Sequence, residues 1–495
     1  MRRLRAWPLY PVVFAVSWVL VTAVDSGVRL QSTLRVFVLV PGVAALLVVV
    51  LAVLLRNAQR AGVAATVLVV LLSSRDFGRL GLGLVGIVAV ALAIVVIRRI
   101  VRRPIPMDRF TAAANLISAI LLATTVVQGM ANGTLPAWVG DLTDQPPTIT
   151  ASDREPPDIY LILLDGYPRQ DTVTEVLGGD NSAFLHQLEA RGFAVDPEAH
   201  SGYMYTDLVL SSMLHGRHVV DIPELQGVIS GASQPARGRQ VMNEAPLLEE
   251  LASAGYTLVA NAQAWDEPAL RRVHRFVEGT GLNEFERHVL LESLPGAVLQ
   301  AIDLSVRQDL MRSWVEDAFD FLPMAAAAEI GGPRFVFAHV PSPHFPVVYT
   351  ADGGYADPRF GYEHPAQVRA ASPAETKAAY LAQVAHLNRR VLDLVDSDVI
   401  PEDAVVVLMS DHGPEFGLNW GDGAASDLQT RFAVLFATRA PDGVFEAGQL
   451  TTGVLVRILT EVLGHNTAEP PDRFFVSAAS PKYATLTEVP SPFHD

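Results

Sequence analysis

Residues Val405–Gly413 read VVVLMSDHG. A run of apolar, mostly β-branched residues predicts a strand whose two faces are both buried. The strand delivers Asp411 and His412, side by side, into the loop at its carboxyl end, which is the edge of an open α/β sheet where ligands bind. A carboxylate and an imidazole at this edge indicate a metal site. A solvated loop that happens to hold both residues is the alternative interpretation.

The chain on either side of this strand alternates between strand-like and helix-like segments. Further strands are predicted at 158–164, 256–260, 334–339 and 431–438, and helices at 182–191, 247–254, 374–395 and 450–463. Such alternation is typical of a mostly parallel central sheet flanked by helices. We therefore predict an α/β domain over residues 158–480, followed by a C-terminal tail over 481–495.

The first 130 residues have a different character, because long charge-free apolar runs recur there. These runs cover residues 7–24, 36–55, 61–74, 80–97 and 110–128. All but the shorter run 61–74 approach the roughly 20 residues that cross a bilayer. We predict an N-terminal bundle of five transmembrane helices over 1–130, joined to the α/β domain by a proline-rich linker over 131–157.

The arginine residues decide on which side of the membrane the α/β domain lies. With five spans, one side holds Arg2, Arg3, Arg5, Arg56, Arg60, Arg98, Arg99, Arg102, Arg103 and Arg109, and the opposite short loops hold Arg29, Arg35, Arg75 and Arg79. Cytoplasmic loops carry the excess of Lys and Arg. The chain is therefore expected to be a multi-pass cell-membrane protein whose domain from about residue 130 onward is extracytoplasmic.

The composition of the chain excludes several classes of function. The 495 residues include no cysteine, which excludes disulfides, zinc–thiolate sites and a cysteine nucleophile. The net charge is −16, and the outer part has no basic stripe, which argues against a nucleic-acid partner. Of the possible partners, the apolar N-terminal runs point to the membrane bilayer.

Two more residues stand where chemistry is expected. Asp165 follows the apolar run 159–164 and precedes Gly166, so it ends a buried strand as Asp411 does. A buried carboxylate costs free energy unless it is paired or bound to metal, although a simple strand-ending turn is the alternative. Thr206 stands where an aromatic segment gives way to a helix-like apolar run. Its hydroxyl is either an N-cap or a metal-activated nucleophile at a helix end that attracts phosphate oxygens.

Three basic side chains have two interpretations each. His344 lies in a loop, residues 341–346, that three prolines restrain, and it either meets a substrate phosphate or a leaving alkoxide, or is a capped surface residue. His339 precedes this loop and has the same two interpretations, of which a packing residue at a strand end is favoured. Arg431 opens the strand predicted over 431–438 and either contacts phosphate or lies at the edge of the core.

Taken in order, these motifs resemble those of the alkaline phosphatase/sulfatase superfamily. The motifs are LLDG at 163–166, a threonine ahead of an apolar Ser-Ser helix, PHFP at 343–346 and SDHG at 410–413. Five spans followed by an outer domain are similar to lipoteichoic acid synthases and phosphoethanolamine transferases of bacterial envelopes. The chain departs from the pattern at Gly166, where sulfatases carry a second Asp, and in having no further histidine over 413–423.

The resemblance implies a role for each matching residue. Asp165, Thr206, Asp411 and His412 would bind one divalent metal ion. Thr206 would be the nucleophile that carries a phospho-intermediate, and His344 would bind substrate or act as an acid–base group. Two carboxylates, an imidazole and an alkoxide form a mixed oxygen and nitrogen site that suits Zn²⁺ or Mn²⁺.

The expected function is that of a membrane-bound, metal-dependent phosphotransferase. Its donor would be a phosphodiester, and the membrane anchor favours a phospholipid head group because tethering raises the donor's effective concentration. Two alternatives stay open. One is a sulfatase-like hydrolase or phosphodiesterase that acts on a soluble ester, and the other is a catalytically inactive envelope protein.

Overall fold

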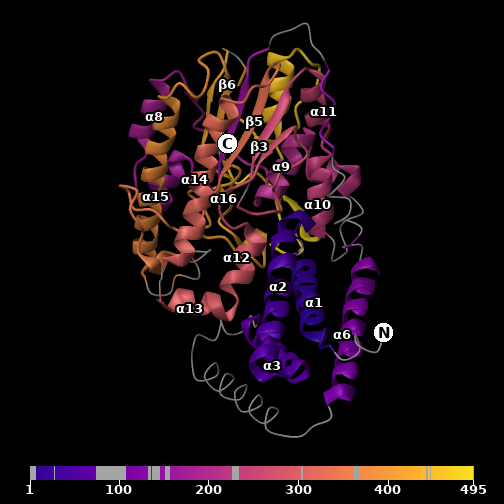
Figure 1. Ribbon diagram of the computed structural model, residues 1–495. Helices are drawn as coiled ribbons and strands as arrows, with labels where there is room; N and C mark the ends of the chain where they lie inside the picture. The colour runs from indigo at the N-terminus through magenta and orange to yellow at the C-terminus, as the bar shows by residue number, and fades with distance from the viewer. Residues whose placement is uncertain are drawn as a thin grey trace. The chain divides into compact units, whose positions relative to one another are not determined.

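The computed structural model describes residues 7–26, 28–73, 107–131, 145–150, 156–225, 234–262, 264–302, 305–361, 371–441 and 447–493, with a few single positions between them (Figure 1). The chain divides into two compact units. The first comprises residues 1–143 and 282–307, and the second comprises residues 144–281 and 308–495. The domain predicted over 158–480 is thus interrupted by a segment that groups with the N-terminal helices.

A mixed sheet forms the centre of the second unit. Within the described residues its strand order is β2-β7-β6-β1-β5-β3-β4. The strands are β1 (Ile159–Leu164), β2 (Ala194–Val195), β3 (Thr257–Asn261), β4 (Arg275–Val277), β5 (Arg334–Val340), β6 (Val405–Met409) and β7 (Phe436–Arg439). Strands β6, β1, β5, β3 and β4 are parallel to one another, β7 pairs antiparallel with β6, and β2 pairs antiparallel with β7. The predicted α/β class with a mostly parallel centre is confirmed.

Helices cover both faces of this sheet, which explains why the central strands β1 and β6 are continuous apolar runs. Along β1, Tyr160 and Ile162 face a core shared with α8 (Ser182–Glu189), α14 (Val306–Ala326) and α15 (Pro373–Val395). Leu161 and Leu163 face the opposite core, shared with α9 (Thr206–His215), α10 (Gln234–Asn243), α11 (Pro246–Ser253) and α17 (Val454–Arg457). Figure 1 shows α8, α14 and α15 on one side of the strands and α9, α10 and α11 on the other. Side chains alternate across a strand, so burial on both faces requires a continuous apolar run.

The strand predicted over 431–438 is wrong in its first half. A short helix, α16 (Leu428–Phe432), occupies this stretch, and β7 begins only at Phe436. Asp427 starts the helix, because its side chain accepts a hydrogen bond from the backbone N–H of Thr430 at 3.2 Å. The helix predicted over 450–463 contains α17 at its centre. A tighter 3₁₀ turn, η8 (Thr451–Gly453), precedes α17, and a wider π-helical turn, η9 (Ile458–Val462), follows it.

The C-terminal segment, which the sequence assigned to a tail, belongs to the folded unit as far as it is described. Strand β9 (Thr487–Val489) pairs antiparallel with β8 (Phe474–Val476). The Lys482 ammonium lies 2.9 Å from Asp207 and 2.8 Å from Glu267. Other short helical turns are η2 (Thr172–Val176), η3 (Val219–Asp221), η4 (Pro223–Leu225), η5 (Pro358–Phe360), η7 (Gly423–Ala425) and η10 (Tyr483–Thr485).

The first unit consists of helices throughout its described residues. They are α1 (Tyr10–Ser26), α2 (Leu30–Leu55), α3 (Ala58–Leu72), α6 (Met107–Ala131), α12 (Glu284–Leu291) and α13 (Leu294–Ile302). Two of them, α2 and α6, are long and apolar enough to cross a membrane, while α1 and α3 are shorter apolar helices. The predicted span 80–97 lies outside the described residues, so the bundle of five stays a prediction.

Candidate metal centre

The ends of two neighbouring parallel strands bring two carboxylates and one imidazole together. Asp165 follows β1, and Asp411 and His412 follow β6, the strand that pairs with β1. One ligand atom from each of the three residues lies within 4.8 Å of the others. His412 Nε2 is 3.7 Å from Asp165 Oδ1 and 3.2 Å from Asp411 Oδ2. All three residues are buried, with at most 2% of their surface exposed.

Thr206 reaches the same group from a different element. It is the first residue of α9, and its Oγ1 lies 3.4 Å from His412 Nε2. The segment before it is fixed by aromatic packing, since Tyr203 stacks on Phe475 with ring centroids 5.2 Å apart. The structure therefore places together the four residues that the sequence proposed as metal ligands.

The donor set fits a small divalent cation. Two atoms that are each about 2.1 Å from a tetrahedral ion lie about 3.4 Å apart, close to the three separations measured from His412 Nε2. Asp165 Oδ1 and Asp411 Oδ2 are buried and have no hydrogen-bond partner in the part of the chain that the structure describes. Buried carboxylate oxygens without a partner are rare and costly. A cation bound between them would remove that cost.

The other atoms of these residues are held by neighbours, as metal ligands usually are. Asp411 Oδ1 accepts a hydrogen bond from the Gly166 N–H at 3.1 Å. His412 Nδ1 lies 3.1 Å from the Gly413 carbonyl, so a proton on Nδ1 leaves the lone pair of Nε2 facing the group. Asp165 Oδ2 lies 3.1 Å from Nε2 of His339. His339, which the sequence presented as a packing residue, thus contacts a candidate ligand.

Burial and neighbouring charges hold His412 and Asp165 in the protonation states that bind cations. Burial, with a further contribution from the charge of Arg431, lowers the pKa of His412 to about 4. Burial alone would raise the pKa of Asp165, but the charge of His344 and the hydrogen bond from His339 hold that pKa below its ordinary value. His412 is therefore neutral and Asp165 ionised near pH 7.

His344 lies beside this group and is paired with an acid that the sequence did not reveal. Its Nε2 is 2.9 Å from Oε1 of Glu415, which is buried, and its backbone N–H donates to the Asp165 carbonyl at 2.9 Å. Burial alone would lower the pKa of His344, but the carboxylates of Glu415 and Asp165 raise it to about 10. Glu415 stands three residues after His412, and an acid so close to SDHG was the sequence signal that could have identified it.

Arg431 connects the segment before Thr206 to the loop that follows His412. Its Nη1 donates to the Gly413 carbonyl at 2.7 Å, and its Nε donates to the Met204 carbonyl at 2.9 Å, with Nη2 as a second donor to the same oxygen. The side chain is buried, so of its two interpretations the core residue is the one that fits. Gly413 has to be glycine, because a Cβ there would lie 2.0 Å from the Thr430 carbonyl oxygen.

A mostly parallel α/β sheet, a buried Asp–Asp–His group at its strand ends and a threonine at a helix N-terminus define the alkaline phosphatase/sulfatase superfamily. The family model for sulfatases matches residues 157–436, more than half of the chain. The chain belongs to the sulfatase family. A search of curated protein sequences gives no match.

Solved structures similar to this chain include both transferases and hydrolases. The soluble domain of lipooligosaccharide phosphoethanolamine transferase A from Neisseria meningitidis is 12% identical, with a TM-score of 0.40, and the match covers 64% of this chain and 93% of that one. The integral membrane form of that transferase, also 12% identical, has a TM-score of 0.38 and is matched over 92% of this chain and 94% of its own. The phosphonate monoester hydrolase SpPMH from Silicibacter pomeroyi is 14% identical, with a TM-score of 0.43, and 64% and 79% of the two chains are covered.

Proposed function

We propose that this protein is a membrane-anchored phosphotransferase that uses Thr206 as its nucleophile and a phospholipid as its donor. The observation that carries the proposal is the position of the Thr206 hydroxyl, 3.4 Å from His412 Nε2 and at the first residue of α9. A helix N-terminus favours the negative charge of phosphate oxygens. A hydroxyl, a set of cation ligands and an anion-favouring helix end therefore meet at one point.

Asp165, Thr206, Asp411 and His412 would hold one divalent cation, Zn²⁺ or Mn²⁺. When bound, the cation would supply positive charge that lowers the pKa of the Thr206 hydroxyl and offsets the charge of the phosphate oxygens. The mixed oxygen and nitrogen donors suit either ion. Two carboxylate oxygens that have no hydrogen-bond partner among the described residues, Asp165 Oδ1 and Asp411 Oδ2, support this assignment.

The protein groups account for two displacement steps. In the first, the Thr206 alkoxide forms a bond to phosphorus, the bond from phosphorus to the diacylglycerol oxygen breaks, and protonated His344 gives its proton to that oxygen. In the second, an acceptor hydroxyl attacks phosphorus, passes its proton back to His344 and displaces the Thr206 alkoxide. Water in place of the acceptor would give hydrolysis instead of transfer.

The membrane assignment rests on helix composition and on exposed apolar surface. Helices α2 and α6 are long and apolar enough to span a bilayer. Large apolar side chains stay exposed along α2, including Val38 at 76% and Val53 at 73%. Contiguous apolar surface of this kind is typical of a membrane-contacting face. With the arginine distribution, it favours a multi-pass protein whose α/β unit is extracytoplasmic.

Product analysis with a labelled phospholipid tests the proposed function. The full-length protein in detergent micelles or nanodiscs receives lipid labelled in the head group and, separately, in the acyl chains. We expect diacylglycerol from the acyl label and a transferred head group on an added acceptor, both lost with a chelator and restored by Zn²⁺ or Mn²⁺. Turnover of a soluble phosphodiester with no diacylglycerol would instead favour the hydrolase. Unchanged turnover in the chelator would reject metal dependence.

His344→Gln is expected to lower kcat by about 10²- to 10⁴-fold, the range for loss of an acid–base group. Glu415→Gln should lower kcat less, because it removes the partner that orients and charges His344 but leaves the imidazole in place. Initial rates with the labelled phospholipid measure both effects. Gln187→Ala, a substitution on the exposed surface of α8 in the same unit, is the control and should not change kcat. Equal rates for His344→Gln and the unmodified protein would remove His344 from the mechanism.

A further inference from the structure

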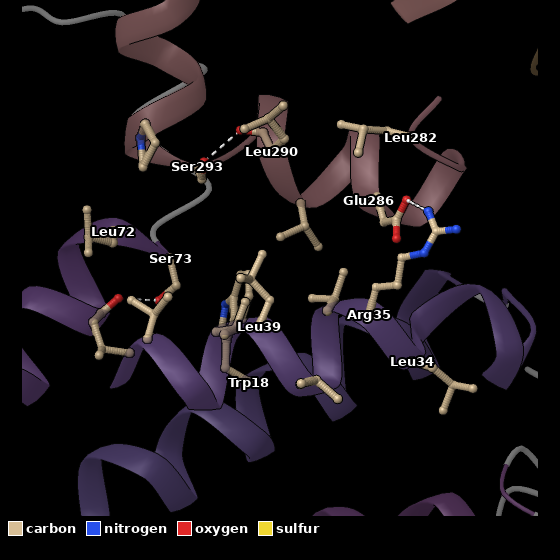
Figure 2. A pocket seen from close by; sticks show the side chains of 17 residues that line it. Trp18, Leu34, Arg35, Leu39, Leu72, Ser73, Leu282, Glu286, Leu290 and Ser293 are labelled. Carbon is tan, nitrogen blue, oxygen red and sulfur yellow. Dashed lines mark hydrogen bonds and ion pairs between the residues drawn. The ribbon is translucent and has the colours of Figure 1, made fainter. Parts of the chain in front are cut away.

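A large apolar pocket lies within the first unit. Its volume is about 940 Å³, at the upper end of the roughly 300–1,000 Å³ typical of pockets that bury small ligands. Trp18 of α1, Leu39 of α2 and Leu72 of α3 line it from the N-terminal helices, and Val289 of α12 lines it from the inserted segment. Figure 2 shows these helices on either side of the pocket, with the side chains of Trp18 and Leu39 between them.

The pocket is open to the surroundings of the helices. Val38 and Leu39, which both line it, are 76% and 65% exposed. Helix α13, which contains the lining residue Pro295, also exposes apolar side chains, with Val298 at 37% and Ile302 at 79%. Exposed apolar side chains that lie next to one another in this way are typical of a membrane-contacting face.

One charged pair lies in this mostly apolar lining. Arg35 Nη1 is 3.5 Å from Glu286 Oε2, and the two side chains are 69% and 6% exposed (Figure 2). The same Glu286 Oε2 accepts a hydrogen bond from the Asn283 N–H at 3.0 Å, which closes the capping box at the start of α12. Glu286 Oε1, in contrast, is buried and has no hydrogen-bond partner among the described residues.

The pocket extends along α2 over a length close to the depth of one bilayer leaflet. Its α2 residues run from Leu34 to Val43, roughly 14 Å of helix at 1.5 Å per residue, which is about half the thickness of a hydrocarbon core. In the five-span topology, α2 begins on the extracytoplasmic side. Arg35 would then lie near the outer head groups, with the apolar lining below it at the depth of the acyl chains.

We propose that this pocket binds one phospholipid of the outer leaflet and selects its head group. The acyl chains occupy the apolar lining, Arg35 binds the phosphate, and Glu286 Oε1 accepts a hydrogen bond from the head group. The head group must therefore carry an N–H or O–H donor, as ethanolamine and glycerol do and choline does not. The inference rests on the proposed function for its membrane topology, and it narrows the donor to lipids of this class.

Photo-crosslinking tests the pocket itself. The full-length protein in nanodiscs receives phosphatidylethanolamine with a diazirine in one acyl chain, and the crosslinked peptides are mapped by mass spectrometry. We expect crosslinks on residues 34–43 and 286–295, and at least a fivefold reduction with Val289→Trp, which fills the pocket. Val53→Trp, on the exposed part of α2 outside the lining, is the matched control and should not reduce them. Crosslinks spread evenly along α2, or unchanged in Val289→Trp, would overturn the proposal.

Glu286→Gln tests head-group selection without disturbing the fold, because glutamine also completes a capping box. The unmodified protein should crosslink the ethanolamine and glycerol lipids about tenfold more than the choline lipid, the factor expected for one charge-assisted hydrogen bond. In Glu286→Gln, the extent of crosslinking should be nearly the same for the three lipids. Equal labelling of all three by the unmodified protein would reject the role of Glu286.

Thr206→Ala separates this inference from the proposed function. The diazirine lipid should label this variant as strongly as the unmodified protein, because the substitution leaves the pocket intact. Turnover should nevertheless be lost. Labelling of the pocket by an unmodified protein that transfers no head group would reject the proposed function and keep the lipid site. Transfer of the head group without labelling of the pocket would reject the lipid site and keep the proposed function.

Discussion

Thr206→Ala is expected to reduce transfer of the labelled head group by at least about 10⁴-fold, as loss of a nucleophile does in other two-step enzymes. The substitution removes the oxygen that would bond to phosphorus and a candidate cation ligand, while α9 keeps its remaining contacts. Because Thr206 is half-buried at a helix start and Tyr205 is the N-cap residue, the fold should change little. Steady-state rates and intact-mass detection of a phospho-adduct measure the effect.

Two further variants at this position separate the hydroxyl from the shape of the side chain. Thr206→Val keeps the branched shape without the oxygen and should be as inactive as alanine. Thr206→Ser keeps the oxygen and should retain measurable turnover and a phospho-adduct. A Thr206→Val protein that still transfers the head group would show that the nucleophile lies elsewhere.

Arg431→Leu is expected to cause the largest loss of stability of any single change near the site. It would leave the Met204 and Gly413 carbonyls without the donors that they now have. An unsatisfied buried polar group costs about 1–3 kcal/mol, so the free energy of unfolding should fall by about 3 kcal/mol. Turnover should fall as well, because these carbonyls position the loops that carry Thr206 and His412. Thermal denaturation of the full-length protein measures the stability, and the labelled lipid measures the rate.

Arg439→Leu is the matched control for this change. Arg439 ends β7, and its half-buried side chain donates a hydrogen bond to the Pro401 carbonyl at 3.1 Å and lies 5.6 Å from the centre of the Phe193 ring. Its loss should lower the free energy of unfolding by no more than about 1 kcal/mol, the upper end for a cation–π contact at an exposed site. Arg431→Leu and Arg439→Leu proteins with equal denaturation midpoints would show that the Arg431 contacts do not hold the site together.

The central strands were predictable because burial on both faces leaves a continuous apolar run. Strand β6 has the predicted bounds, Val405–Met409, and β1 begins one residue later than predicted. The structure of the stretch before β7 was not predictable in this way. Residues Phe432 to Ala437 are all apolar, and such a run fits the end of a helix as well as a strand. The antiparallel pairing of β7 with β6 depends on how the chain returns to the sheet, which no local pattern encodes.

The candidate ligands were predictable from position, since Asp165 and Asp411 both follow buried strands. Their neighbours were harder to predict. Glu415 pairs with His344, and Arg431 joins two carbonyls, through contacts between residues distant in sequence. Nor did periodicity indicate that residues 282–307 would leave the α/β unit and group with the N-terminal helices. That segment is amphipathic, as a helix packed on any apolar surface would be.

Metal content of the purified full-length protein tests the central claim most directly. We expect close to one equivalent of Zn²⁺ or Mn²⁺ per chain in the unmodified protein and in Thr206→Ser. Less than about a tenth of an equivalent is expected in an Asp165→Ala/Asp411→Ala double variant that remains folded. Retention of the ion by the double variant, or its absence from an active unmodified protein, would contradict the account.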